Sequence, residues 1–160
     1  MTWIRGINLG FAVLAVLGPM AHVLELPNKL ALGPELWLAV QQHLYRGWGP
    51  FLGAPAELGA LVTSLLLIYP RRRSRPALAA TVLASLGYAG MLAAFFVLNR
   101  PVNSAIVSWT AADLPSDWMA YRARWETGHA IAAALSVVSL AALAWSCVRE
   151  RQASRERADA

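Results

Sequence analysis

The segment Gly128–Val148, GHAIAAALSVVSLAALAWSCV, contains no Asp, Glu, Lys or Arg. About 20 apolar residues in a helix, each rising ~1.5 Å, cross the hydrocarbon core of a bilayer. This segment therefore predicts a membrane-spanning helix. The motif Trp125-Glu126-Thr127-Gly128-His129 stands at its start, where a charged segment gives way to the apolar one.

Three further apolar runs precede this one, and together they decide the class of protein. The chain of 160 residues is 58% hydrophobic and only 14% charged, whereas soluble domains carry about 25% charged residues. We predict an all-α fold, an integral membrane four-helix bundle in a single domain over residues 1–148, followed by a charged cytoplasmic tail, 149–160. The predicted spans are about 3–26, 51–69, 77–98 and 128–148.

The first run has a competing interpretation as a cleaved signal peptide, because Arg5 precedes the apolar stretch Leu9–Leu17. No Ala-x-Ala cleavage site follows that stretch, so an uncleaved helix is favoured.

Two longer connections separate the first span from the second and the third span from the fourth. In the first, Pro34 suits the opening turn of a short helix, Glu35–Tyr45, whose apolar stripe favours a position along the membrane interface. In the second, Trp118–Arg124 predicts a helix that leads into the last span. We expect these two short interfacial helices to cap the non-cytoplasmic end of the bundle.

The basic residues cluster beside apolar runs, so the pI of about 10.1 indicates membrane topology and no nucleic acid partner. The two chain ends and the turn near Arg72 carry a charge of +6 and the rest of the chain −1, which accounts for the formal net charge of +5. By the positive-inside rule, both termini are cytoplasmic in a multi-pass protein of the cell (inner) membrane. The bilayer is the first expected partner, and a homo-oligomer is compatible with these runs. The single Cys147 excludes an intrachain disulfide.

Polar groups near the opposite end are the candidates for chemistry. His22 and Glu25 stand three residues apart, as do Glu126 and His129, so each pair shares one face of its helix. Glu57 lies inside the second span, where an ionised carboxylate costs at least ~2.5 kcal/mol without a partner, a cavity or water. Its functional interpretation is a metal ligand or proton relay. The alternative is a neutral or Arg-paired carboxylate that only fixes helix packing.

Histidine and carboxylate together suit zinc, iron or copper, and Glu-x-x-His pairs recur in metal-binding bundles. Opposite chain directions should bring His22 and His129 to one height, so a divalent transition metal is a candidate cofactor. A haem between the two histidines is less favoured, because no apolar pocket is readable. The alternative is a hydrogen-bond network in which Glu126 pairs with Arg122 one turn earlier. The predicted metal ligands are His22, Glu25, Glu57, Glu126 and His129.

Several residues flank this face. Asn99 and Asn103 could orient a substrate carbonyl or phenolate, whereas Lys29 and Arg100 fit helix termination and interface anchoring better. His43 fits a histidine over the headgroups better than a third imidazole ligand. The tryptophans fit an interfacial belt better than a stacking site. The predicted catalytic set is His22, Glu57, His129, Asn99 and Asn103.

Four short spans, the segment Asn99-Arg100-Pro101-Val102-Asn103 and the Trp-rich helix Trp118–His129 resemble the anthrone-oxygenase-like family of small membrane proteins. The resemblance covers nearly the whole chain in architecture. It implies an O₂-dependent oxidation of a phenolic tricyclic anthrone to an anthraquinone. The family pattern has Asn after the Trp and Arg after the His. Here those places hold Glu126 and Ala130, which favours a more carboxylate-rich site.

The first functional hypothesis is therefore a membrane-embedded oxidoreductase, or oxygenase-like protein, that acts on a small lipophilic, phenolic or quinone-like molecule. A histidine or carboxylate would take the carbon-bound proton. The second hypothesis is a non-catalytic membrane binding or accessory protein whose His/Glu cluster is structural. A transporter ranks third, because four spans are few and no inverted repeat is visible.

Overall fold

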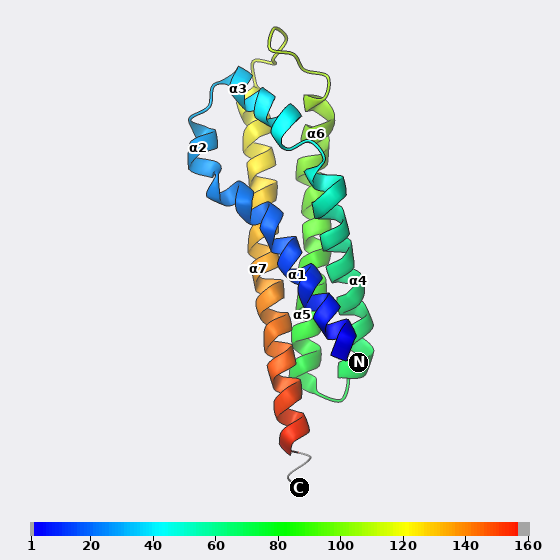
Figure 1. Cartoon of the computed structure of the whole chain (residues 1–160). Helices are drawn as coiled ribbons and strands as arrows, with labels where there is room; N and C mark the ends of the chain where they lie inside the picture. The colour runs from blue at the N-terminus through cyan, green and yellow to red at the C-terminus, as the bar shows by residue number, and fades with distance from the viewer. Residues whose placement is uncertain (1, 157–160) are drawn as a thin grey trace.

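The computed structural model describes residues 2–156, and every regular element among them is helical. The four longest helices are α1 (Thr2–Leu24), α4 (Ala54–Arg71), α5 (Arg75–Ala94) and α7 (Trp118–Glu156). Each overlaps a segment long and apolar enough to cross a membrane: Trp3–Leu24, Gly49–Arg71, Arg75–Ile106 and Trp118–Ala153. The predicted all-α four-helix bundle is thus confirmed (Figure 1). Residues 157–160 of the predicted tail lie outside the described part.

Two of the four spans are longer than a bilayer requires. Helix α5 continues through the π-helical turn η3 (Phe95–Asn99) into α6 (Arg100–Ile106). Helix α7 has 39 residues and therefore runs about 58 Å, against ~30 Å of hydrocarbon core. Both helices rise past α1 and α4 at the end opposite the two termini (Figure 1). The site described below is built on these projecting ends.

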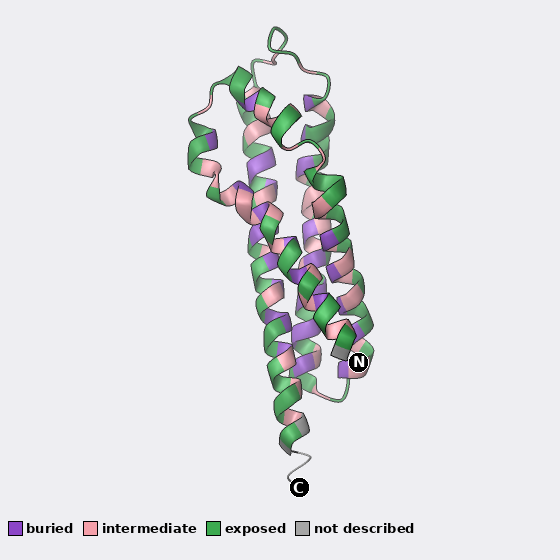
Figure 2. Ribbon diagram, viewed as in Figure 1, coloured by how far each residue is buried: buried purple, intermediate pink, exposed green. Residues whose placement is uncertain are grey.

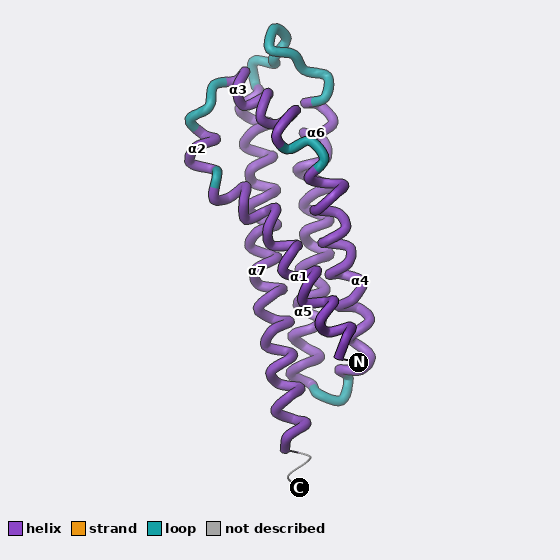
Figure 3. Tube along the Cα trace, viewed as in Figure 1, coloured by secondary structure: helices purple, strands orange, loops and turns teal. Residues whose placement is uncertain are grey.

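The first connection folds onto the projecting ends as a cap. It contains α2 (Leu26–Leu30), α3 (Pro34–Ala39) and the π-helical turns η1 (Val40–Leu44) and η2 (Gly49–Gly53). The expected interfacial helix Glu35–Tyr45 is thus α3 with η1. The expected Trp118–Arg124 helix is the first part of α7 rather than a separate element. Loops gather at this end of the molecule, as Figure 3 shows.

The cap has a hydrophobic core of its own, separate from that of the bundle. Trp37 is fully buried, and the second buried tryptophan of the cluster, Trp125, belongs to α7. The sequence placed Trp37 in an interfacial belt, but its ring packs inside the cap against α6 and α7. The core residues of the cap are Trp37, Leu38, Val102, Ile106 and Trp125.

The bundle core consists largely of small side chains, while many large apolar ones are exposed. Figure 2 shows how buried and exposed positions alternate along the helices. Ala60 and Ala84 are fully buried, whereas Leu65 and Leu86 are exposed. Lipid tails are as apolar as leucine, so helices in a membrane associate through close packing of small residues. A methyl group added at Gly87 would overlap the hydroxyl of Ser139, so α5 and α7 are in close contact there.

The end that carries both termini is held by a buried arginine. Arg71 is 1% exposed and donates to Glu150 at 3.3 Å and to Thr81 at 2.8 Å. Arg5 donates to the same carboxylate at 3.1 Å. Glu150 therefore joins α1, α4 and α7 at this end, and Thr81 adds α5.

Candidate functional site

Pro101 determines the local structure at the top of the third span. Proline lacks a backbone N–H, so it cannot donate to the carbonyl four residues earlier in a helix. The carbonyl in question belongs to Val97, within η3, and it accepts a hydrogen bond from Arg124 Nη2 of α7 at 2.6 Å. The π-helical turn and Pro101 together place Asn99 against α7.

Asn99 and Asn103 hold the entrance of the fourth span. Asn99 Nδ2 donates to the carbonyl of Trp125 at 2.9 Å, and Asn103 Oδ1 accepts from the indole Nε1 of Trp125 at 2.8 Å. Asn99 is buried and Asn103 exposed. Their amides, which the sequence assigned to substrate, therefore fix the backbone and ring of Trp125.

His22 of α1 and His129 of α7 lie side by side, with 4.1 Å between ring centroids. The Trp125 ring contacts both, at 4.2 Å from His129 and 4.7 Å from His22. Tyr45 meets His22 edge-on at 4.5 Å. The two histidines therefore lie at the same height in the bundle, as the sequence predicted.

Glu25 lies on the outer side of this pair. Its carboxylate accepts a hydrogen bond from the hydroxyl of Tyr45, and Oε2 is 3.8 Å from His22 Nδ1. Burial raises the pKa of the Tyr45 phenol above its usual range, and the hydrogen bond to Glu25 raises it further. Tyr45 was not among the predicted site residues. It ends the expected interfacial helix, and nothing in that position marks it as a partner of α1.

Glu126 is paired with Lys29 of α2 rather than with Arg122. The Lys29 ammonium is 2.8 Å from Glu126 Oε2, and the two side chains are 4% and 8% exposed. The same ammonium lies 5.0 Å from the centre of the Trp125 ring. Arg122 instead reaches the backbone carbonyls of Lys29, Leu30 and Leu32 at 3.4–3.5 Å. Lys29 is therefore a buried charge within the site, not an interface anchor.

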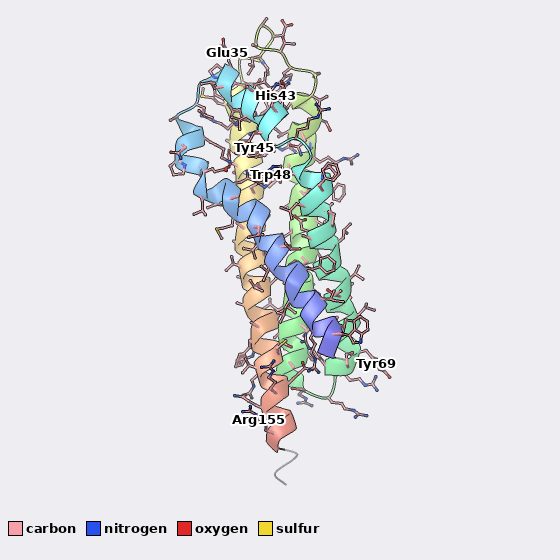
Figure 4. All side chains as sticks on the ribbon, viewed as in Figure 1. Glu35, His43, Tyr45, Trp48, Tyr69 and Arg155 are labelled. Atoms are coloured by element: carbon pink, nitrogen blue, oxygen red, sulfur yellow. The ribbon has the colours of Figure 1, made fainter. Side chains whose placement is uncertain are left out.

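A cavity of about 1130 Å³ lies beneath the cap. Gln42 lines this cavity and donates hydrogen bonds to the backbone carbonyls of Ile106 and Trp109, both at 2.9 Å. Tyr45 and Trp48, labelled in Figure 4, belong to the connection that covers it, as does His43. All five predicted catalytic residues line this cavity: His22, Glu57, Asn99, Asn103 and His129.

Two buried polar atoms on the cavity wall, His22 Nδ1 and Gln41 Nε2, make no hydrogen bond within residues 2–156. Glu57 also lines this wall and is half-buried. An unpaired buried polar group costs ~1–3 kcal/mol. Such groups on the wall of an apolar cavity are typical of a binding site, because a few convergent polar groups orient the ligand there.

The five predicted metal ligands do not form one coordination set. Within the described residues, no three His, Cys, Asp or Glu side chains are arranged to hold a metal ion. Glu126 is bonded to Lys29 and Glu25 to Tyr45. His22 and His129 offer two imidazoles, and Glu57 lies in the cavity wall.

Comparison of the chain with protein-family models, curated proteins and solved structures found no match.

Proposed function

We propose that the cavity binds a small lipophilic molecule, phenolic or quinone-like, and that the protein is a membrane-embedded oxidoreductase acting on it with O₂. The observation that carries this proposal is the pairing of an apolar cavity of about 1130 Å³ with unpartnered polar groups on its wall. The charge asymmetry of the chain supports, by the positive-inside rule, a proposed orientation in which the cavity faces the non-cytoplasmic side of the inner membrane and both termini are cytoplasmic.

The chemistry needs a base and an electron acceptor. In an anthrone-type oxidation, one CH₂ group and O₂ become one ketone and one water. His129 or His22 would accept the carbon-bound proton, since imidazole is the commonest general base. The deprotonated substrate then reduces O₂ directly. Glu25, whose side chain is 40% exposed, lies next to His22 and offers the proton a route towards the outer water.

The competing proposal is a binding or accessory protein without catalysis. A specific observation favours it: the carboxylates of Glu25 and Glu126 and the amide of Asn99 are all bonded within the protein. Binding without turnover would then be the function of the cavity. Both proposals require a ligand, and they differ only in what happens to it.

Binding can be tested with a matched pair of substitutions in α4. Leu58 and Leu65 are 48% and 49% exposed, but only Leu58 lines the cavity. In lipid nanodiscs, menadione should quench part of the tryptophan fluorescence, because Trp48 and Trp125 line the cavity. Leu58→Phe should weaken this quenching several-fold, and Leu65→Phe should leave it at the wild-type level. Equal quenching in both variants and in wild type would place the quinone in the bilayer alone.

Catalysis can be tested with 1,8-dihydroxyanthrone, following O₂ uptake and anthraquinone absorbance against empty nanodiscs. The wild type should exceed the background rate, and His129→Phe should return it to background. Glu57→Gln and Glu57→Leu test whether Glu57 accepts a proton or only packs between helices. Both substitutions should lower the rate if Glu57 takes part in catalysis. Metal analysis of the same samples would show whether either substitution removes a bound ion. Quinone binding without turnover would support the accessory protein.

A further inference from the structure

A second hollow lies at the opposite end of the molecule, where α1 begins and α4 ends. This groove has a volume of about 440 Å³. Its inner wall is apolar and includes Ile4, Leu66 and Leu67. Trp3 and Tyr69 stand at its edges and are each 69% exposed, and Figure 4 shows Tyr69 at this end of the bundle.

The arginines near the groove fall into two groups. Arg5 and Arg71 point inward and share the carboxylate of Glu150. Arg72 and Arg73 line the groove and are exposed, and neither has an acidic partner within residues 2–156. The Arg72 guanidinium lies 3.6 Å from the centre of the Tyr69 ring. The groove therefore has two uncompensated positive charges and no acidic residue in its lining.

The groove also has the polarity of a lipid molecule along its length. Helix α4 ends at Arg71, so Arg72 and Arg73 stand at the level where lipid headgroups begin. Leu66 precedes that end of the helix by between one and two turns, at acyl-chain depth. Exposed Trp and Tyr mark the same boundary, since their amphipathic rings prefer the headgroup level.

We propose that this groove is a binding site for one anionic phospholipid. Its phosphate would sit on Arg72 and Arg73, because guanidinium groups match phosphate oxygens in bidentate geometry. One acyl chain would lie on Leu66 and Ile4, between the rings of Trp3 and Tyr69. A zwitterionic lipid would place its own cationic group near the same two arginines. Because like charges repel, it should bind less well.

Native mass spectrometry tests the proposal on the full chain, released from micelles that contain equal amounts of dioleoylphosphatidylglycerol and dioleoylphosphatidylcholine. The wild type should retain the anionic lipid in preference. Arg72→Gln with Arg73→Gln should reduce that preference about five-fold per arginine, the factor for ~1 kcal/mol per basic residue at an anionic surface. Arg73→Gln alone should reduce the preference for the anionic lipid less than the double variant does, and it keeps the contact between Arg72 and Tyr69.

Arg75→Gln is the matched control, because Arg75, the first residue of α5, is exposed but does not line the groove. It should keep the wild-type preference. An equal loss in Arg75→Gln would overturn the proposal in favour of general surface charge, and an unchanged preference in the double variant would overturn it outright. Inorganic phosphate should displace no more lipid than chloride at the same ionic strength. A greater displacement would make this a site for free phosphate.

Discussion

The ion pair of Lys29 and Glu126 is the feature of single residues that most affects the candidate site. Both side chains are almost fully buried, so each charge has lost most of its hydration. The opposite charge of the partner compensates part of that loss. The pair joins the cap to α7 beside Trp125, whose ring the ammonium also contacts. It thereby orders the groups around His22 and His129.

Removing one charge of this pair should cost more stability than removing both. We expect Lys29→Met or Glu126→Leu alone to lower the free energy of unfolding by ~3–5 kcal/mol, because each leaves an uncompensated buried charge. The double variant should recover most of that loss. Thermal unfolding in detergent measures all four proteins, and losses that simply add in the double variant would contradict a coupled pair.

At the scale of elements, the contact of α7 with η3 depends on Gly128. A methyl group at this position would overlap the side-chain amide of Asn99. That amide is bonded to the carbonyl of Trp125 and has little freedom to move away. The absence of a side chain at Gly128 therefore lets the fourth span approach the third at the level of the cavity.

Gly128→Ala should destabilise the protein by ~1–3 kcal/mol, the usual cost of overpacking, and should weaken menadione quenching by moving α7 away from η3. Gly10→Ala is the matched control, since no atom lies within 4 Å of the added methyl group. Alanine favours a helix over glycine by ~1 kcal/mol, so this control should be neutral or stabilising. A Gly128→Ala protein as stable as the Gly10→Ala protein would argue against the close contact.

The sequence predicted the four spans and the meeting of His22 with His129, because length, hydropathy and chain direction together set the depth of each residue. It did not predict the partner of Glu126. Local spacing pointed to Arg122, whereas Lys29 comes from a connection whose path depends on cap packing. The role of Tyr45 was missed for the same reason. Likewise, the pattern around Pro101 indicated the end of a span, but the span continues because Arg124 satisfies the carbonyl of Val97.

Across the whole molecule, the two ends differ in chemistry. One end holds both termini (Figure 1) and the arginines bound to Glu150, together with the groove beside Arg72. The other holds the cap, the three histidines and the large cavity. A lipophilic substrate would reach the cavity from one leaflet, and the proposed phospholipid would bind in the other.

This asymmetry predicts a membrane orientation that can be tested in intact cells. Cysteines are introduced at Ser74, in the turn after α4, and at Ser116, in the exposed loop before α7. Cys147 is half-buried and 3.4 Å from Arg71 Nη2, so Cys147→Ser provides the background. An impermeant thiol reagent should label the Ser116→Cys protein, and the Ser74→Cys protein only after permeabilisation, because the positive-inside rule predicts a cytoplasmic arginine-rich end. Labelling of Ser74→Cys but not of Ser116→Cys in intact cells would reverse the orientation. It would also move the cavity to the cytoplasmic leaflet.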